Sequence, residues 1–282
     1  MSTHDPLTLE CTDLEVTFTV PASAGGGQVR AVRGVTLRAD KGCVLGVVGE
    51  SGSGKSTLAR ALVGLQHPTS GHVRCAGVDL ARSSLAVRRK VGRRVSMIFQ
   101  DPRSSLNPRL TVGAVITDPL VVHGVGNKAS RRGVLFRLLA DVGLPAIVAE
   151  RPVRTLSGGQ LQRVAIARTL ALEPDFIVAD EPTSALDVSI QAQILNLLAD
   201  LRAEHEFGML VISHDMRVMR FLCDEIIVML DGEVVERGAA DRIFTQPEHN
   251  YTRRLISATP LLAGRAGSDR WGAVDPSASF TP

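Results

Sequence analysis

The sequence predicts an α/β fold in which a mostly parallel sheet carries helices on both faces. Three observations support this fold class. Short, continuously apolar segments recur along the chain, as expected for strands buried on both faces, and segments of helical periodicity separate them. A glycine-rich loop follows the first apolar segment directly and leads into helix-forming residues. The apolar segments are 44–48, 95–99, 176–179, 209–212 and 226–230.

The bulk composition restricts the class of protein. The chain has 282 residues and a formal net charge of +3, which is too small to indicate nucleic-acid binding by itself. Its N-terminus shows no secretory signal, and no apolar run approaches the roughly 18 residues of a spanning helix. Any membrane role is therefore expected to come through a partner. The cysteines lack C-x-x-C spacing, which favours a reduced, cytoplasmic chain without disulfide bonds or a zinc site; they are Cys11, Cys43, Cys75 and Cys223.

The N-terminal region predicts a small antiparallel sheet. Alternating apolar residues from Leu14 to Val20, Phe18 among them, share one face of a first strand. The glycines at 25–27 break this strand, and residues 29–37 have the pattern of a second one. The two strands are expected to pair before the parallel core begins.

The rest of the chain divides into an insertion, late strands and a tail. From about 101 to 165 the strand signal disappears and helical segments dominate, which predicts a helical subdomain inserted into the core. Asp231-Gly232 has the composition of a hairpin turn. Residues 264–282 are small and polar and are expected to form a loose tail. The clearest helical pattern places one apolar face on Ile190, Ile194, Leu197, Leu198 and Leu201.

Residues 49–57 match the pattern G-x-x-x-x-G-K-[ST] in the strand–loop–helix context that this motif requires, which predicts a P-loop NTPase core. Glycines let the backbone approach a phosphate so that N–H groups face its oxygens. Lys55 is expected to reach the β- and γ-phosphates of ATP, and the Ser56 hydroxyl to ligate Mg²⁺. A glycine-rich turn with an exposed lysine is the alternative. The candidate ATP-binding residues are Gly49, Ser51, Gly52, Gly54, Lys55, Ser56 and Thr57.

Two carboxylates, Asp180 and Glu181, end the apolar strand 176–179. Open α/β sheets place their ligands at the carboxyl ends of strands. Asp180 is therefore a candidate Mg²⁺ ligand, acting through water, and Glu181 a candidate general base that polarises the attacking water. Adjacent acids at a strand end are also common in solvated turns, but the P-loop earlier in the chain favours the catalytic interpretation.

A second phosphate-binding feature lies at residues 156–160, with the sequence Leu-Ser-Gly-Gly-Gln. Its glycine pair falls at an expected helix start, where unpaired N–H groups and the helix dipole favour an anion. Further candidate ATP-binding residues are therefore Ser157, Gly158, Gly159 and Gln160. One chain carries two phosphate-recognition surfaces, and one ATP could need both, from two copies.

The order of these motifs resembles that of the ATP-binding-cassette (ABC) transporter ATPases. The series is the P-loop, Gln100, residues 156–160, Asp180-Glu181, residues 184–187 and His214. The resemblance implies a nucleotide-binding domain over residues 1–245, with an antiparallel β subdomain and the helical subdomain at about 101–165. A C-terminal helix and tail over 246–282 would follow. It also implies a head-to-tail dimer in which Ser157, Gly158 and Gly159 of one copy face the γ-phosphate bound by the other.

The resemblance implies roles for four further residues. Gln100 is expected to sense Mg²⁺ and the attacking water, and His214 to contact the γ-phosphate while holding Glu181. An exposed amide at a strand end and a capping or surface histidine are the alternatives. Asp187 is expected at the dimer interface, or as the N-cap of the next helix. Phe18 resembles the aromatic residue that stacks on adenine, with ordinary core packing as the alternative.

Two segments, 99–109 and 249–258, resemble the oligopeptide, dipeptide and nickel uptake branch of the family. The resemblance implies an ATPase that energises import of short peptides or a related small solute, with nickel or a metal chelate as a further possibility. No cysteine follows Cys223, so no iron–sulfur site is expected. A soluble ABC ATPase acting on nucleic acid or ribosomes, and an exporter subunit, are the alternatives.

The same resemblance implies partners and a location. The expected partners are a second ABC ATPase subunit (copy or paralogue), two transmembrane permease subunits and an extracytoplasmic solute-binding protein. The chain is then a peripheral protein at the cytoplasmic face of the cell membrane, and no nucleic acid is expected as a partner.

Overall fold

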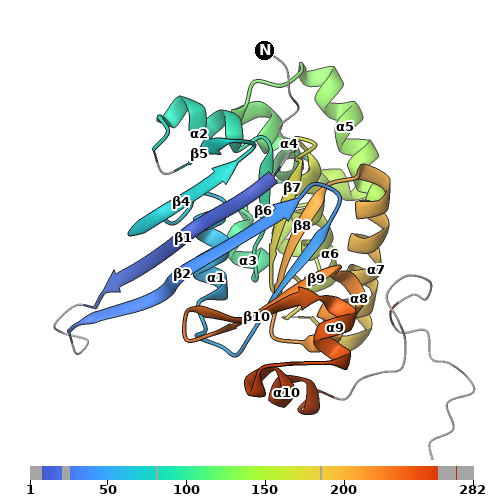
Figure 1. Ribbon diagram of the computed structural model, residues 1–282. Coiled ribbons are helices and arrows are strands. Elements are labelled where there is room, and N and C mark those ends of the chain that lie inside the picture. Colours follow the sequence, from blue (N-terminus) through green and yellow to red (C-terminus); the bar gives the residue numbers. More distant parts are fainter. Residues whose placement is uncertain (1–7, 21–25, 81, 185, 260–270, 272–282) are drawn as a thin grey trace, which may run out of the picture.

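Two β-sheets and the helices around them make up the described part of the chain (Figure 1). The computed structural model describes residues 8–20, 26–80, 82–184, 186–259 and 271. The predicted α/β class is confirmed. Among the described helices, none is both long enough and apolar enough to cross a membrane.

The larger sheet has six strands in the order β10-β9-β3-β8-β7-β6. Five of them run parallel, and β10 pairs with β9 in the antiparallel sense at one edge. All five predicted apolar segments are strands of this sheet. Its strands are β3 (Val44–Val48), β6 (Val95–Ile98), β7 (Phe176–Asp180), β8 (Gly208–Ser213), β9 (Glu225–Leu230) and β10 (Glu233–Ala239).

The smaller sheet is antiparallel, with the order β2-β1-β4-β5. Its strands are β1 (Thr8–Thr19), β2 (Gln28–Asp40), β4 (Ser70–Cys75) and β5 (Val78–Asp79). The first two were predicted, whereas β4 and β5 were missed. In β4 only Val73 and Cys75 are buried, so the segment carries little apolar signal of its own and depends on pairing with β1.

The alternation expected for β1 is interrupted. Leu14 and Val16 are buried, but Phe18 is 39% exposed. The register against β2 shifts between Leu14 and Val16 and again between Val16 and Thr17. Phe18 therefore lies outside the core, so the alternative of ordinary core packing for this residue is wrong.

The helices form an inserted group and several that flank the sheet. In the inserted region lie α3 (Pro102–Ser105), α4 (Val112–Val122), α5 (Lys128–Asp141) and α6 (Gly158–Leu170), with short 3₁₀ turns at Ala146–Glu150 and Val153–Thr155. The other helices are α1 (Lys55–Leu62), α2 (Leu85–Val91), α7 (Val188–His205), α8 (Met216–Leu222), α9 (Ala240–Thr245) and α10 (Asn250–Ser257). The short helix α2 carries three basic residues in its last turn, Arg88, Arg89 and Lys90.

Strand β3 shows how the core is arranged on two sides of the larger sheet. Val44 and Val48 belong to one buried cluster, together with residues of α4 to α8, whereas Leu45 and Val47 belong to the other. Leu58 and Leu62 of α1 pack in the second cluster with the antiparallel sheet. One face is therefore covered by helices and the other by α1 and a second sheet.

The C-terminal elements return to the body of the molecule. Asp231 and Gly232 have φ of 49° and 85°, which is the geometry of the predicted hairpin turn between β9 and β10. Trp271 packs edge-on against Phe221 of α8 at 5.3 Å, and its backbone exchanges two hydrogen bonds with the side chain of Asn196 in α7. The rest of the predicted tail at 264–282 lies outside the described residues.

Candidate nucleotide and magnesium site

The P-loop joins the end of β3 to the start of α1, and glycine is required at two of its positions. A Cβ on Gly54, which has φ of 95°, would lie 2.0 Å from the Ala31 carbonyl oxygen. A Cβ on Gly49 would lie 2.2 Å from the carbonyl oxygen of Met229. The loop is therefore seated against β2 and β9, with the N-terminus of α1 open for an anion.

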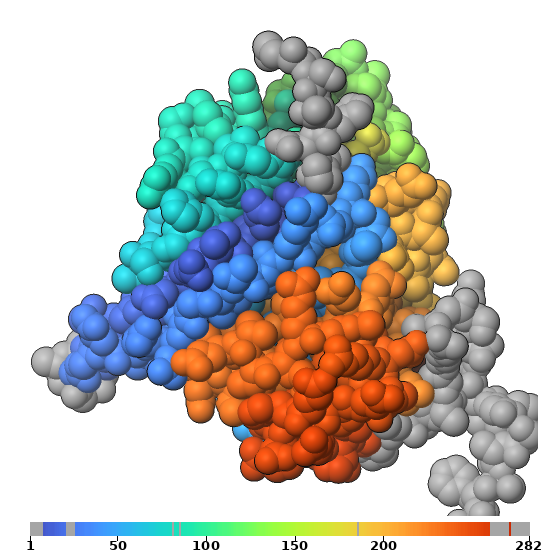
Figure 2. All heavy atoms as spheres, in the orientation of Figure 1, coloured from blue at the N-terminus to red at the C-terminus, as the bar shows by residue number. Residues whose placement is uncertain are grey.

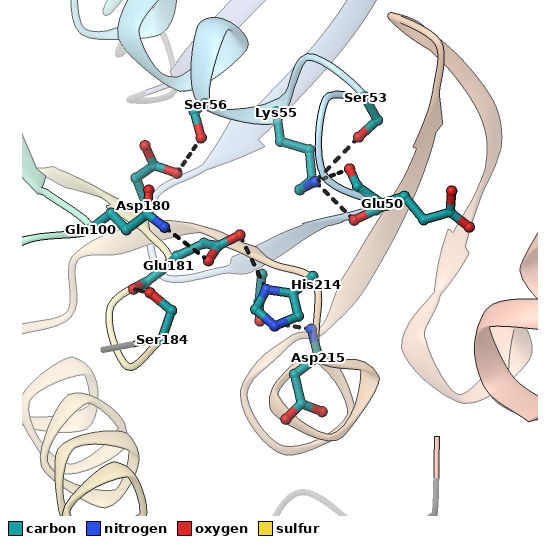
Figure 3. A network of polar contacts seen from close by, with 12 residues as sticks. Glu50, Ser53, Lys55, Ser56, Gln100, Asp180, Glu181, Ser184, His214 and Asp215 are labelled. Carbon is teal, nitrogen blue, oxygen red and sulfur yellow. Dashed lines mark hydrogen bonds and ion pairs between the residues drawn. The ribbon is translucent and has the colours of Figure 1, made fainter. Parts of the chain in front are cut away.

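Lys55 is buried and its ammonium group points back into the loop (Figure 3). Nζ donates to the carbonyl oxygens of Gly49 and Glu50 at 2.8 and 2.7 Å, and to Ser53 Oγ at 3.2 Å. Burial lowers the pKa of Lys55, and nearby carboxylates, with that of Glu181 first, oppose this shift. The loop thus holds a cation where triphosphate oxygens are expected.

Ser56 and Asp180 meet beside this loop. The Ser56 hydroxyl donates to Asp180 Oδ1 at 2.9 Å, although the two residues come from α1 and β7 (Figure 3). Burial raises the pKa of Asp180, which is 2% exposed. A buried carboxylate therefore lies next to a hydroxyl oxygen.

This pair of oxygen donors fits Mg²⁺. No cluster of three or more His, Cys, Asp or Glu side chains suited to a metal occurs in the described part of the chain. Magnesium does not need such a cluster, because it is commonly bound through one or two protein oxygens, substrate phosphates and water. Ser56 and Asp180 could therefore hold the ion of a Mg²⁺–nucleotide complex.

Glu181 is held between two side chains from neighbouring strand ends. Gln100 Nε2 donates to Glu181 Oε2 at 3.3 Å, and His214 Nδ1 lies 3.2 Å from Oε1 (Figure 3). Glu181 has φ of 45°, which is uncommon for a residue other than glycine, and its N–H donates to the Ile212 carbonyl oxygen at 2.9 Å. Strained backbone of this kind is often found where a side chain must be aimed.

The arrangement can support water activation. The Glu181 side chain is 16% exposed and adjoins the buried Asp180. A water beside Ser56 and Asp180 could therefore give its proton to the Glu181 carboxylate. The structure brings together Lys55, Ser56, Asp180, Glu181, Gln100 and His214.

Residues 156–160 lie at the start of α6, where Gly158 lines a small cavity together with Gln100 and Pro182. Ser157 is the N-cap of that helix, and a capping box joins its side chain and backbone to Gln160. The helix start that was predicted at the glycine pair is therefore confirmed. A Cβ on Gly158 would lie 3.5 Å from Leu186, and one on Gly159 only 2.7 Å from Ile190, so the segment packs against the start of α7 and the loop before it.

The positions of Phe18 and Asp187, the two other candidates, do not by themselves define a role. Phe18 is exposed on β1, so its ring is open to a ligand and is not part of the core. Asp187 occupies the N-cap position of α7, but its side chain makes no capping hydrogen bond. Within 184–187, Ala185 lies outside the described residues.

Sequence reasoning missed two serines that support the site. Ser53 is 4% exposed and accepts a hydrogen bond from Lys55, and the Ser184 hydroxyl donates to the Glu181 carbonyl oxygen at 3.2 Å. Both belong to segments that the motifs had singled out. Ser53 stands at an x position of the P-loop pattern, and the motif at 184–187 gave no role to its serine.

The fold and this site define a P-loop nucleotide-binding protein with strand-end carboxylates beside the loop. Residues 32–184 match a family model described as ABC transporter. The chain belongs to this family, as an ABC transporter ATP-binding domain.

Relatives with similar sequences carry peptide-transport names. The chain is 45% identical, over 84% of its length and 74% of the relative, to the di/tripeptide transport ATP-binding protein DppF of Pseudomonas aeruginosa. It is 46% identical to a putative peptide import ATP-binding protein of Brucella ovis, over 82% of this chain and 73% of that protein. It is 44% identical to the dipeptide transport ATP-binding protein DppF of Escherichia coli, over 83% of this chain and 70% of that protein.

A solved structure supports the fold assignment. The dimeric structure of a post-hydrolysis state of the ATP-binding cassette MJ0796, bound to ADP and Pi, superposes with a TM-score of 0.74. Its sequence is 31% identical, and the match covers 82% of this chain and 98% of that one.

Proposed function

We propose that this chain is the ATP-hydrolysing subunit that energises import of short peptides through a membrane ABC transporter. The observation that carries the proposal is the meeting of the P-loop lysine, the Ser56–Asp180 oxygen pair and Glu181 at one sheet edge. Relatives named for di/tripeptide and peptide transport, at 44–46% identity, support the solute class.

The roles within the site follow from chemistry. Lys55 and the N–H groups of residues 49–57 bind the phosphates, and Ser56 with Asp180 holds Mg²⁺, which neutralises charge on the phosphate oxygens. Glu181 takes the proton of the attacking water, and Gln100 and His214 keep its carboxylate in place. Phe18 stacks on the adenine of ATP.

The helix start at Ser157 completes the site of a second ATPase subunit. Gly158 and Gly159 offer backbone N–H groups at the start of α6, whereas Ser157 and Gln160 shape this helix start through their capping box. In none of the printed hydrogen bonds of the group around Glu181 does this segment take part. The dimer of the cassette MJ0796 supports such an assembly. Asp187 lies beside this contact, and the partner is a copy of this chain or a paralogue.

The remaining partners are two transmembrane permease subunits and an extracytoplasmic solute-binding protein, with the chain bound peripherally at the cytoplasmic face of the membrane. A tagged chain purified from detergent-solubilised membranes of its host should recover the permeases, identified by mass spectrometry. Recovery of ribosomal or DNA-associated proteins alone would contradict transport.

Peptide import is tested directly by uptake of a labelled dipeptide in cells that lack this chain. Re-expression of the wild type should restore uptake, and re-expression of Glu181→Gln at the same level should not. Uptake of labelled nickel in the same strains tests the metal alternative. Dipeptide uptake that is unchanged by loss of the chain would overturn the proposal.

A further inference from the structure

The C-terminal helix α10 reaches the P-loop through one tyrosine. Tyr251 is 2% exposed, and its Oη accepts a hydrogen bond of 2.7 Å from the backbone N–H of Glu50. These residues are 201 positions apart in the sequence. Figure 2 shows the orange and red C-terminal elements lying directly against the blue strands that precede the P-loop, and β10 contacts β2.

The N–H that Tyr251 binds belongs to the peptide unit between Gly49 and Glu50. The carbonyl of this same unit, that of Gly49, accepts a hydrogen bond of 2.8 Å from Lys55 Nζ. The described residues contain no cis peptide bond, so the N–H and C=O of the unit point in opposite directions. The peptide unit is therefore hydrogen-bonded on both sides, to Tyr251 through its N–H and to Lys55 through its carbonyl oxygen.

Because residue 49 is glycine, these two hydrogen bonds matter for the orientation of the peptide. Its carbonyl direction is set by backbone dihedrals that no side chain restrains. The close approach of the Met229 carbonyl, 2.2 Å from a hypothetical Cβ, excludes any larger residue. The hydrogen bond from Glu50 to Tyr251 is thus a restraint on a peptide unit that lacks restraint of its own.

Tyr251 is itself held in place. The Glu236 carboxylate of β10 accepts hydrogen bonds from the N–H groups of Glu248 and His249, at 2.8 and 3.0 Å. His249 caps α10 by accepting from the Tyr251 N–H. Burial raises the pKa of the Tyr251 hydroxyl, which stays neutral and able to accept from an amide.

We propose that Tyr251 is a positioning residue for ATP binding, which acts by orienting the Gly49–Glu50 peptide and, through its carbonyl, Lys55. The inference rests on the proposed function, because it requires Lys55 to bind phosphate. It makes helix α10 part of the nucleotide site, although the sequence placed residues 246–282 after the ATPase domain.

The test is calorimetric titration of Mg²⁺–ATP into the purified full chain and its Tyr251→Phe variant, which removes only the hydroxyl. The dissociation constant for ATP should rise about tenfold, since an unpaired amide and a freed peptide weaken the loop. The rate of hydrolysis at saturating ATP should stay within about twofold, because bound phosphates then restrain the loop themselves. Ser257→Ala is the matched control, since it removes a hydroxyl of the same helix that bonds only to the carbonyl oxygen of Arg254 among the printed contacts.

Equal ATP affinity in Tyr251→Phe and wild type, or an equal loss in Ser257→Ala, would overturn the inference. Should Tyr251→Phe not fold, Glu236→Gln keeps the tyrosine and loosens its helix, and unchanged ATP affinity in that variant counts against the inference. Lys55→Ala distinguishes failure of the positioning role of Tyr251 from failure of the proposed ATP site. If Lys55→Ala abolishes binding while Tyr251→Phe does not alter it, only the positioning role fails; if Lys55→Ala binds normally, the proposed ATP site fails.

Discussion

His214 and Glu181 form a contact between two strand ends, with Nδ1 of the imidazole 3.2 Å from Oε1 of the carboxylate. Gln100 approaches the other oxygen of the same carboxylate at 3.3 Å. The general base that we propose is therefore restrained on both oxygens by groups from separate parts of the chain. Its position therefore depends on neighbouring strand ends as well as on its local turn.

Glu181→Gln should lower the rate of ATP hydrolysis by about 10²–10⁴-fold, because the amide cannot accept the proton of the attacking water. ATP binding should persist, since Lys55 and Ser56 are unchanged. Phosphate release from purified chain measures the rate, and calorimetry measures binding. Glu173→Gln, at an exposed carboxylate that pairs with Arg137, is the control and should hydrolyse normally. Near-normal turnover in Glu181→Gln would remove the base role.

Gly159→Ala should destabilise the chain by about 1–3 kcal/mol, which is the usual cost of overpacking. The added methyl would lie 2.7 Å from Ile190 Cγ2, so helices α6 and α7 must separate. Urea unfolding monitored by circular dichroism gives the free energy of unfolding.

Gly158→Ala is the matched control for this change, because its methyl would meet Leu186 at an ordinary 3.5 Å. Its free energy of unfolding should stay within about 0.5 kcal/mol of the wild type. Combining Gly159→Ala with Ile190→Ala should recover part of the loss, since the clashing methyl is then absent. A Gly159→Ala variant as stable as Gly158→Ala would contradict the packing described here.

One cysteine of the four should react quickly with a thiol reagent in the native protein. Cys43 is exposed, whereas burial raises the pKa of Cys11 to about 12 and that of Cys75 to about 11, and also raises the pKa of Cys223. A protonated, buried thiol is a poor nucleophile. Titration with a chromogenic disulfide at pH 8 should show one fast equivalent, and Cys43→Ser should abolish it. Four equivalents should appear only in denaturant.

Asp141→Asn should stabilise the chain at neutral pH by about 0.5–1 kcal/mol, because Asp141 is the last residue of α5, where the helix dipole opposes a negative charge. Burial raises the pKa of this carboxyl, and its Oδ2 has no hydrogen-bond partner among the described residues, with His205 Nε2 4.0 Å away. The folded state thus binds the proton more tightly than the unfolded one. The wild type consequently loses stability as the pH rises from the unfolded pKa, about 3.9, through the folded pKa.

Thermal unfolding between pH 4 and 8 measures this difference. The advantage of Asp141→Asn should be largest at pH 7–8 and should shrink towards pH 4, because the wild-type carboxyl gains its proton as the pH falls through its raised pKa. The exposed Glu150→Gln serves as the control and should show no such trend. An advantage that is constant across the range would exclude the charge as its cause.

The sequence predicted the parts of the fold whose signal is local. Strands β3, β7 and β8 are buried along their whole length, so their apolar runs identify them without knowledge of their neighbours. Strand β4 has only two buried residues and becomes a strand by pairing with β1. The exposure of Phe18 likewise depends on how far the core extends along β1, which the alternation of a single strand could not reveal.

The candidate site divides in the same way. Lys55, Ser56 and Asp180 stand in motifs whose spacing indicates a phosphate and magnesium site. The contact between Tyr251 and the Glu50 amide joins residues 201 positions apart and involves a backbone group, which no residue pattern marks. Ser53 bonds to Lys55 and Ser184 to the backbone carbonyl of Glu181, and only the folded geometry gives these two serines a role within their motifs.

Trp271 is the only tryptophan of the chain, and its indole lies edge-on to Phe221 while its backbone is paired with Asn196. All tryptophan fluorescence of this protein therefore arises from one ring at one contact. A change in emission wavelength on adding ATP or a partner would report movement at α7 and α8 without any attached dye. The C-terminal contact thus supplies the protein with an intrinsic optical reporter.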